Sequence, residues 1–494
     1  MRNREAGGLS FPLCLTLIAL AAAALFGPNF VIVSRDLESF MATVYSTILQ
    51  ARALGHGEWV YWTSHLGLGM PQPFAQFLYF HPVQFALQVL TDKTVLVLLY
   101  WSHLAVGGWF VFGTARALGV GPLAALAGAF TWLFCSATVN YSIIDFWPSV
   151  MVGWTMLPPV FFFLLRLLDE SDARTSLLNA SLLALSASLL VLNGHSGVIA
   201  SYAILFCIMI ACMRPSLGRI AWLSGVGSAV ALAVTFRFHH QFIEMSLFPA
   251  ESYRTYVPFN LFTKENIWAL FFKPLYPAGI EGFLTFNFAT GMRNIWIGPV
   301  FLALTTWSMF KADISRAHKR ALATTFIGGL VLVHLPKSLC FDVIAWLIAF
   351  RDPAIVAGIL LASAGLDRLL AQGGLLKKVS LALVGVHFLL MIGGVAPFWL
   401  KNLSTTLVHY GRPPLAIMTP GKHSVADVVE VSPLLLRLKE LHAERPGRFL
   451  YTEGVGRRFP EALIHQGIWT NTLAYHDLPV LNGYFKGVHV PIHP

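Results

Sequence analysis

Two carboxylates stand where the chain leaves its first long apolar segment, in the run Ser34-Arg35-Asp36-Leu37-Glu38. A carboxylate at such an edge could take the proton of an attacking hydroxyl group, as a general base does. Asp36 could equally cap a helix that begins at Leu37, because aspartate is common at that position. Glu38 comes two residues later, about 200° around a helix axis, so the two acids share a site only if Asp36 precedes the helix. Otherwise Glu38 is a solvated surface charge.

A third acid, Asp145, lies at the end of another apolar segment, just before Phe146-Trp147-Pro148. An ionisable group so near hydrocarbon is costly unless it is paired or functional. Together with Asp36 it could hold a divalent metal ion, which would neutralise the charge of a departing phosphate. Pairing with an arginine is the alternative, and both interpretations stay open because the sequence shows no compact metal-ligand motif.

A phosphate leaving group needs fixed positive charge around it. Basic residues near the ends of apolar segments are the candidates: Arg35, Arg237, Arg254, Lys273, Arg293 and Arg351. Arg351 is the most suggestive of them because it precedes an apolar segment directly. The alternative is that Arg351 anchors the membrane interface or forms an ion pair with the adjacent Asp352.

Aromatic and histidine side chains supply the remaining candidates for a binding pocket. Ligand pockets are usually lined by aromatic rings and a few polar groups, and the candidates here are Trp59, Tyr61, Trp62, His65, Gln76, His195 and the pair His239-His240. The aromatic residues could instead form an interfacial belt. The histidines could simply be hydrogen-bonded where their spans end.

The elements that must position these residues are transmembrane helices. The 494 residues are 56% hydrophobic and 12% charged, whereas soluble domains carry about 25% charged residues. Apolar runs of roughly 18 or more residues, bounded by charge, predict a polytopic membrane protein. The net charge of +10 comes from basic residues in short connections, so it does not indicate a nucleic-acid partner. The five cysteines are expected to be small buried apolar side chains without disulfides.

We predict an all-α bundle of about eleven transmembrane helices, near residues 11–33, 94–115, 120–141, 150–168, 176–193, 198–213, 220–236, 294–310, 321–336, 354–371 and 379–400. With a cytoplasmic amino terminus, every connection on the inner side is basic, as orientation in a membrane requires. Two long connections, 34–93 and 237–293, then lie outside. The first begins with apolar residues at helical spacing from Leu37 to Leu49, which predicts an amphipathic surface helix ended by Gly55-His56-Gly57.

The chain therefore divides into a transmembrane domain, 1–400, and an extracytoplasmic region, 401–494. Beyond Leu400 the sequence becomes polar, with a helix-like run at Val431–Leu441 and a strand-like run at Arg448–Tyr451. Such a mixture predicts a small α/β or β-rich unit.

The order of several motifs resembles the YfhO-like bacterial membrane proteins, which belong to the GT-C class of polytopic glycosyltransferases. The motifs are the acid after the first span, Gly57-Glu58-Trp59, Gly67-Leu68-Gly69-Met70-Pro71, Asn193-Gly194-His195, Asn294-Ile295-Trp296-Ile297-Gly298-Pro299 and Phe350-Arg351-Asp352-Pro353. The resemblance covers most of Ser34–Leu400. Relatives in this family are longer, so residues 401–494 are expected to be a shortened outer region.

This resemblance implies a glycosyltransferase of the bacterial cytoplasmic membrane. Its donor would be a sugar on polyprenyl phosphate and its acceptor an envelope polymer or lipid on the outer face, with Asp36 as the general base. Three alternatives remain: a transporter or flippase of lipid-linked sugars, an envelope polymerase or ligase that uses arginine and histidine, and a silent assembly protein. A flippase predicts charged or broken helices at mid-membrane in matched halves, whereas here the acids lie at segment ends.

Overall fold

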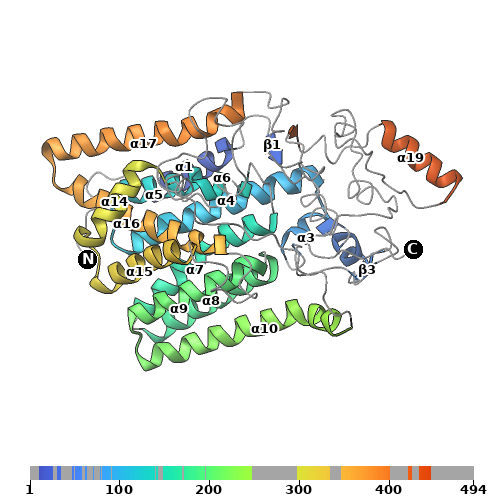
Figure 1. Cartoon of the computed structure of the whole chain (residues 1–494), viewed down its shortest axis with the longest axis horizontal. Coiled ribbons are helices and arrows are strands. Elements are labelled where there is room, and N and C mark those ends of the chain that lie inside the picture. Colours follow the sequence, from blue (N-terminus) through green and yellow to red (C-terminus); the bar gives the residue numbers. More distant parts are fainter. Residues whose placement is uncertain are drawn as a thin grey trace.

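The computed structural model describes residues 10–25, 31–34, 47–48, 50–57, 62–63, 70–71, 78, 81–90, 92–139, 141–142, 148–169, 172–194, 196–247, 297–333, 347–400, 421–424 and 433–446 (Figure 1). Its helices are α1 (Phe11–Leu25), α3 (Val83–Ala86), α4 (Asp92–Ala117), α5 (Pro122–Phe134), α6 (Ser136–Val139), α7 (Pro148–Asp169), α8 (Ala173–Asn193), α9 (Ser196–Met213), α10 (Leu217–Leu247), α14 (Pro299–Lys311), α15 (Arg316–Val333), the 3₁₀ turn η4 (Leu347–Phe350), α16 (Arg351–Ala371), α17 (Gly374–Leu400) and α19 (Pro433–Glu444). Its strands are β1 (Val31–Ser34), β2 (Trp62–Thr63), β3 (Met70–Pro71) and β4 (Gly421–Ser424).

Multiple membrane passes are confirmed by these helices. Seven helical segments of the described chain are long and apolar enough to span a bilayer. Two shorter helical segments are also apolar: α1 and residues Val198–Met213 of α9. Every one of the eleven predicted spans falls on a helix. The chain is therefore a mostly helical, multi-pass membrane protein, while the exact count of eleven spans stays a prediction.

Several predicted spans have different bounds in the structure, including 220–236, which continues in α10 to Leu247. The first predicted span was expected to continue to residue 33, but α1 ends at Leu25, and Val31–Ser34 is a strand. Consecutive β-branched residues favour an extended chain once Gly27-Pro28 has interrupted the apolar run. The third predicted span breaks at Cys135, whose extended backbone separates α5 from α6.

Helix α16 is the centre of the bundle, because its residues from Arg351 to Leu366 are all buried. It packs against α14, α15, α5 and α17. Small residues allow the close approach to α5: a Cβ added at Gly128 would lie 2.3 Å from Ser363 Oγ. Helices α17 and α10 lie at opposite edges of the bundle (Figure 1), and their apolar side chains are mostly exposed, as expected of helices that face lipid.

The basic connections gather at one end of the bundle. His318 Nε2 of α15 contacts Asp169 Oδ2 of α7 at 2.9 Å, and Arg368 of α16 pairs with Asp313 at 2.8 Å. Arg320 donates to the carbonyl of Cys212 at the end of α9. Connections predicted to share one side of the membrane are thus adjacent in space. Which side they face stays a prediction.

At the opposite end, one of the two described strand pairs joins parts of the chain that are distant in sequence. Strand β1 pairs antiparallel with β4, and Ser34 is opposite Gly421. Strands β2 and β3 form a second antiparallel pair within the long connection 34–93, which we call the first outer loop after its predicted side. The predicted end of the surface helix is confirmed: the helix stops at Gly55, and Gly57 adopts a φ of 76° that favours glycine. The predicted tail helix is present as α19.

Candidate active-site region

Arg351 and Asp352 form the first turn of α16, directly after η4. Both side chains are fully buried in the bundle, and α16 begins before residue 354, where the sequence predicted the span to start. Pro353 fits here because the first turn of a helix does not use its backbone N–H groups. The buried charges are tolerated because Arg351 Nε lies 3.1 Å from Asp352 Oδ1.

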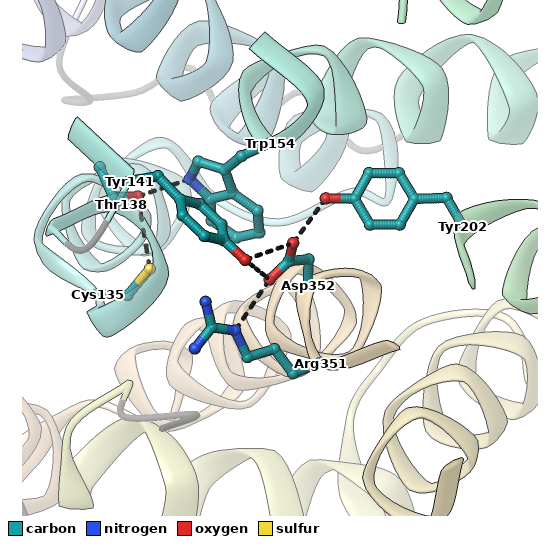
Figure 2. Close-up of polar contacts among 7 residues, drawn as sticks. All are labelled: Cys135, Thr138, Tyr141, Trp154, Tyr202, Arg351 and Asp352. Atoms are coloured by element: carbon teal, nitrogen blue, oxygen red, sulfur yellow. Dashed lines mark hydrogen bonds and ion pairs between the residues drawn. The ribbon is translucent and has the colours of Figure 1, made fainter. Parts of the chain in front are cut away.

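Two tyrosines complete the surroundings of Asp352 (Figure 2). Tyr202 of α9 donates to Asp352 Oδ2 at 2.6 Å. Tyr141, just beyond α6, lies 3.3 and 3.2 Å from the two carboxylate oxygens. Both tyrosines are buried. Three segments of the chain, including the start of α16, therefore meet at one carboxylate.

The ring of Tyr141 is itself held from two sides. The guanidinium carbon of Arg351 lies 5.1 Å from its centroid, which is a cation–π distance. Trp154 of α7 packs edge-on against the same ring at 6.4 Å, and its Nε1 donates to Thr138 Oγ1 at 2.8 Å. Helices α6 and α7 thus fix the orientation of Tyr141 toward Asp352.

This network, which we call the Asp352 cluster (Tyr141, Tyr202, Arg351 and Asp352), is suited to anchoring. Its carboxylate accepts three donors, so its oxygens are occupied and it is a poor general base. The ion pair with Asp352, which was one of the two alternatives for Arg351, is present. The other hypothesis for Arg351, binding of a donor phosphate, stays a prediction.

Most of the other candidates lie outside the described residues: Arg35, Asp36, Glu38, Trp59, Tyr61, His65, Gln76, Asp145, His195, Arg254, Lys273 and Arg293. Trp62 lies in β2, opposite Pro71. His239-His240 belong to α10, which continues to Leu247, so the start of the second long connection is helical.

Arg237, another phosphate candidate, is buried, and its Nη1 donates to the carbonyl of Val191 in α8. This bond joins α10 to the end of α8. Among the cysteines, Cys14 and Cys135 are buried as expected, whereas Cys207 is exposed, which corrects the expectation for that residue. It lies on α9, where an apolar thiol can face lipid as well as protein.

A divalent metal stays a prediction. In the described ranges, no three His, Cys, Asp or Glu side chains are grouped so that they could hold a metal ion. The two acids proposed as ligands, Asp36 and Asp145, lie outside those ranges.

The sequence did not single out the histidine pair formed by His81 and His103. Their Nε2 atoms are 2.7 Å apart, and His103 Nδ1 lies 2.8 Å from Thr155 Oγ1 of α7. One signal was available, because His103 is an ionisable residue in the middle of the predicted span 94–115, and such residues are commonly functional or paired.

A small apolar cleft opens beside this pair, between the first outer loop and the ends of α4 and α7. It is lined by Thr47, Ile48, Leu78, Val83, Leu87, Val95, Leu96, Leu99 and Pro148. It is small, about 10 Å³, and its lining is almost entirely apolar.

Comparison with solved structures places the fold. Two classes of a mutant arabinofuranosyltransferase AftD from Mycobacteria resemble this chain over 91% of its length, with TM-scores of 0.59 and 0.56 at 15% and 14% identity. An oligosaccharyltransferase of Archaeoglobus fulgidus gives a TM-score of 0.49 at 12% identity, over 94% of this chain and 63% of that one. No protein-family model matches the chain, and no curated protein does.

The assignment of the fold rests on the two AftD structures. The chain shares its fold with the matched part of the AftD arabinofuranosyltransferase. It spans 31% of the length of the AftD chains that it matches. At such low identity the likeness establishes the fold alone, so substrates and site residues must come from further argument.

Proposed function

We propose that this chain is a GT-C glycosyltransferase that moves a sugar from a polyprenyl-phosphate donor to an envelope polymer or lipid. The reaction would take place at the outer face of the bacterial cytoplasmic membrane. The observation that carries the proposal is the fold, which follows an arabinofuranosyltransferase over 91% of this chain. A lipid-linked donor must be met at the bilayer edge, and a bundle of apolar helices provides such an edge.

We assign the general base to Asp36. The residue follows β1 by two positions, and β1 is paired with β4 of the tail. The tail strand β4 therefore lies beside the strand that precedes Asp36 in the chain. Glu38 is the second catalytic candidate, and Arg35, Arg293 and Arg351 are candidates for the donor phosphate.

The finer proposal is that the chain is YfhO-like. Its motif Phe350-Arg351-Asp352-Pro353 forms the junction of η4 and α16 and supplies two members of the Asp352 cluster. A motif that fixes the central helix has a clear physical use, which supports treating the resemblance as more than chance.

The proposal is tested by the substitution Asp36→Asn in the purified full chain. Asparagine caps helices about as well as aspartate, so the thermal unfolding should be unchanged, while removal of a general base should lower transfer by about 10²–10⁴-fold. The measurement follows labelled sugar from a polyprenyl-phosphate donor to isolated envelope acceptor.

Asp313→Asn is the matched control. This variant also converts a carboxylate to an amide. Asp313 forms an exposed ion pair with Arg368 at the other end of the bundle, and exposed ion pairs contribute little to stability. Transfer should stay within about twofold of the wild type. Transfer by the Asp36→Asn protein at the control rate would refute the assignment of the base. Movement of the donor across the bilayer without transfer would instead favour the flippase.

A further inference from the structure

A row of hydrogen bonds runs from the first outer loop into the bundle through two histidines. The backbone N–H of Val83 donates to His81 Nδ1 at 3.1 Å. His81 Nε2 faces His103 Nε2 at 2.7 Å, with the ring centroids 4.8 Å apart. His103 Nδ1 then contacts Thr155 Oγ1 at 2.8 Å, and this hydroxyl donates to the carbonyl of Val152 at 3.3 Å.

The two ends of the row fix the position of every proton in it. Because a backbone N–H can only donate, Nδ1 of a neutral His81 must accept, and its proton must sit on Nε2. That proton is donated to Nε2 of His103, so His103 carries its own proton on Nδ1 and donates it to Thr155. The hydroxyl of Thr155 passes its proton to a carbonyl, which can only accept. All four hydrogen bonds therefore point in one direction, from Val83 to Val152.

One additional proton breaks this row wherever it binds. On His81 Nδ1 it would face the N–H of Val83, and on His103 Nε2 it would face the N–H of His81. Either position brings two donors together in a buried place, which removes a hydrogen bond and leaves a desolvated group unpaired.

We propose that His81 and His103 are positioning residues that form a pH-sensitive latch, which holds residues 81–90 of the first outer loop against α4 and α7. The same segment lines the apolar cleft: Leu78 precedes His81, Val83 and Leu87 follow it, and Leu96 and Leu99 of α4 lie opposite. With the latch closed, the cleft keeps its narrow shape. With the latch open, the loop side of the cleft can move away from α4.

The titratable group that faces His81 is His103 on α4, and α7 contributes the uncharged Thr155. Burial lowers the pKa of His81 well below its usual range, and the charge of His103 lowers it further. A group whose folded-state pKa is lowered binds fewer protons in the folded state than in the unfolded state between the two pKa values. Its contribution to stability is therefore complete above about pH 6.5 and is lost as the pH falls.

Hydrogen–deuterium exchange of the full-length wild-type chain tests the latch directly. Protection of the peptide that contains residues 81–90 is compared at pH 7.5 and pH 5, after correction for the intrinsic pH dependence of exchange. We expect this peptide to lose about tenfold or more of its protection at pH 5. The reason is that each pH unit below about 6.5, the pKa of a histidine in the open state, raises the open population about tenfold until the lowered pKa of the closed state is reached. The peptides of α16 should keep theirs. Equal protection of residues 81–90 at both pH values would overturn the proposal.

Two substitutions separate a latch from a merely structural contact. His103→Gln keeps an acceptor for His81 and a donor for Thr155, but the amide does not titrate. In the His103→Gln variant, the protection of residues 81–90 should match that of the wild type at pH 7.5. At pH 5 it should fall less than in the wild type. His103→Leu should lose protection at both pH values. If glutamine and leucine behave alike, the two histidines are not a latch. If the leucine variant does not fold, the comparison of the wild type with the glutamine variant at the two pH values still tests the latch.

The consequence for catalysis rests on the proposed glycosyltransferase function. If residues 81–90 border the donor site, their release at pH 5 should change the KM for the lipid-linked donor more than kcat, and His103→Gln should reduce this acid effect. Because hydrogen exchange is measured without any substrate, a failure of the latch proposal can be distinguished from a failure of the proposed function. A pH-dependent latch in a protein that transfers no sugar refutes the proposed function alone. Sugar transfer with pH-independent protection refutes the latch alone.

Discussion

At the residue scale, Asp352 shows how a carboxylate can be held inside a membrane bundle. Its ion pair with Arg351 keeps the net charge of the cluster near zero, and the tyrosine hydroxyls occupy the remaining lone pairs. Removing one partner of a buried ion pair lowers the free energy of unfolding by more than the intact pair contributes, because the other charge is left buried without a partner. The Asp352 cluster is therefore sensitive to the loss of any single member.

Tyr202→Phe should lower the free energy of unfolding by about 1.5–3 kcal/mol, the usual range for a hydrogen bond to a charged group. Tyr141→Phe should cost less, because its bonds to Asp352 are longer, 3.2–3.3 Å against 2.6 Å, and its ring can still face Arg351. Thermal unfolding in detergent, read by near-UV circular dichroism, gives the order of the two variants. A larger loss for Tyr141→Phe would contradict the geometry.

At the scale of elements, the bundle depends on close contact between α16 and its neighbours. Gly128 lets α5 approach α16 at Ser363, and Gly365 gives α14 the same access, since an added Cβ would lie 2.0 Å from Ser308 Oγ. Small residues at such positions are the usual way for helices to approach closely in a membrane.

Gly128→Ala should therefore destabilise the protein by about 1–3 kcal/mol through overpacking of a full interface. Gly385→Ala on α17 is the matched control, because an added Cβ there meets open space, and alanine has the higher helix propensity by up to about 1 kcal/mol. Unfolding of both variants in the same detergent is the measurement. Equal stability of the two proteins would show that α5 and α16 can separate at no cost.

At the scale of the whole molecule, the bundle has two chemically different ends. One collects the basic connections and their ion pairs. The other carries the β1–β4 pair, the histidine pair and the apolar cleft. If the basic end faces the cytoplasm, the cleft and the chain that leads to Asp36 face outward, where the proposed acceptor is located.

Cysteine labelling in intact cells tests this orientation. Gln372→Cys lies in the exposed connection between α16 and α17 at the basic end, and Val89→Cys is exposed on the first outer loop. A membrane-impermeant maleimide should label Val89→Cys and leave Gln372→Cys unlabelled until the membrane is opened, with the wild-type chain as the baseline. The reverse pattern would invert the predicted topology.

The sequence by itself determined the membrane class, the approximate position of each helix, and the grouping of the basic connections. These properties depend only on residues that are near one another in the sequence. Hydropathy over about twenty residues locates a span, and a glycine such as Gly57 ends a helix. Arg351 could also be singled out, because its position at the start of a span is a sequence property.

Only the tertiary structure decided which side chains meet. Asp352 bonds to Tyr141 and Tyr202, which are 211 and 150 residues away, and His81 reaches His103 across the boundary between loop and span. Helices in a bilayer are apolar on nearly all sides, so the pattern of residues does not mark which face turns inward. That choice is made by the packing of neighbouring helices, which depends on all of them at once.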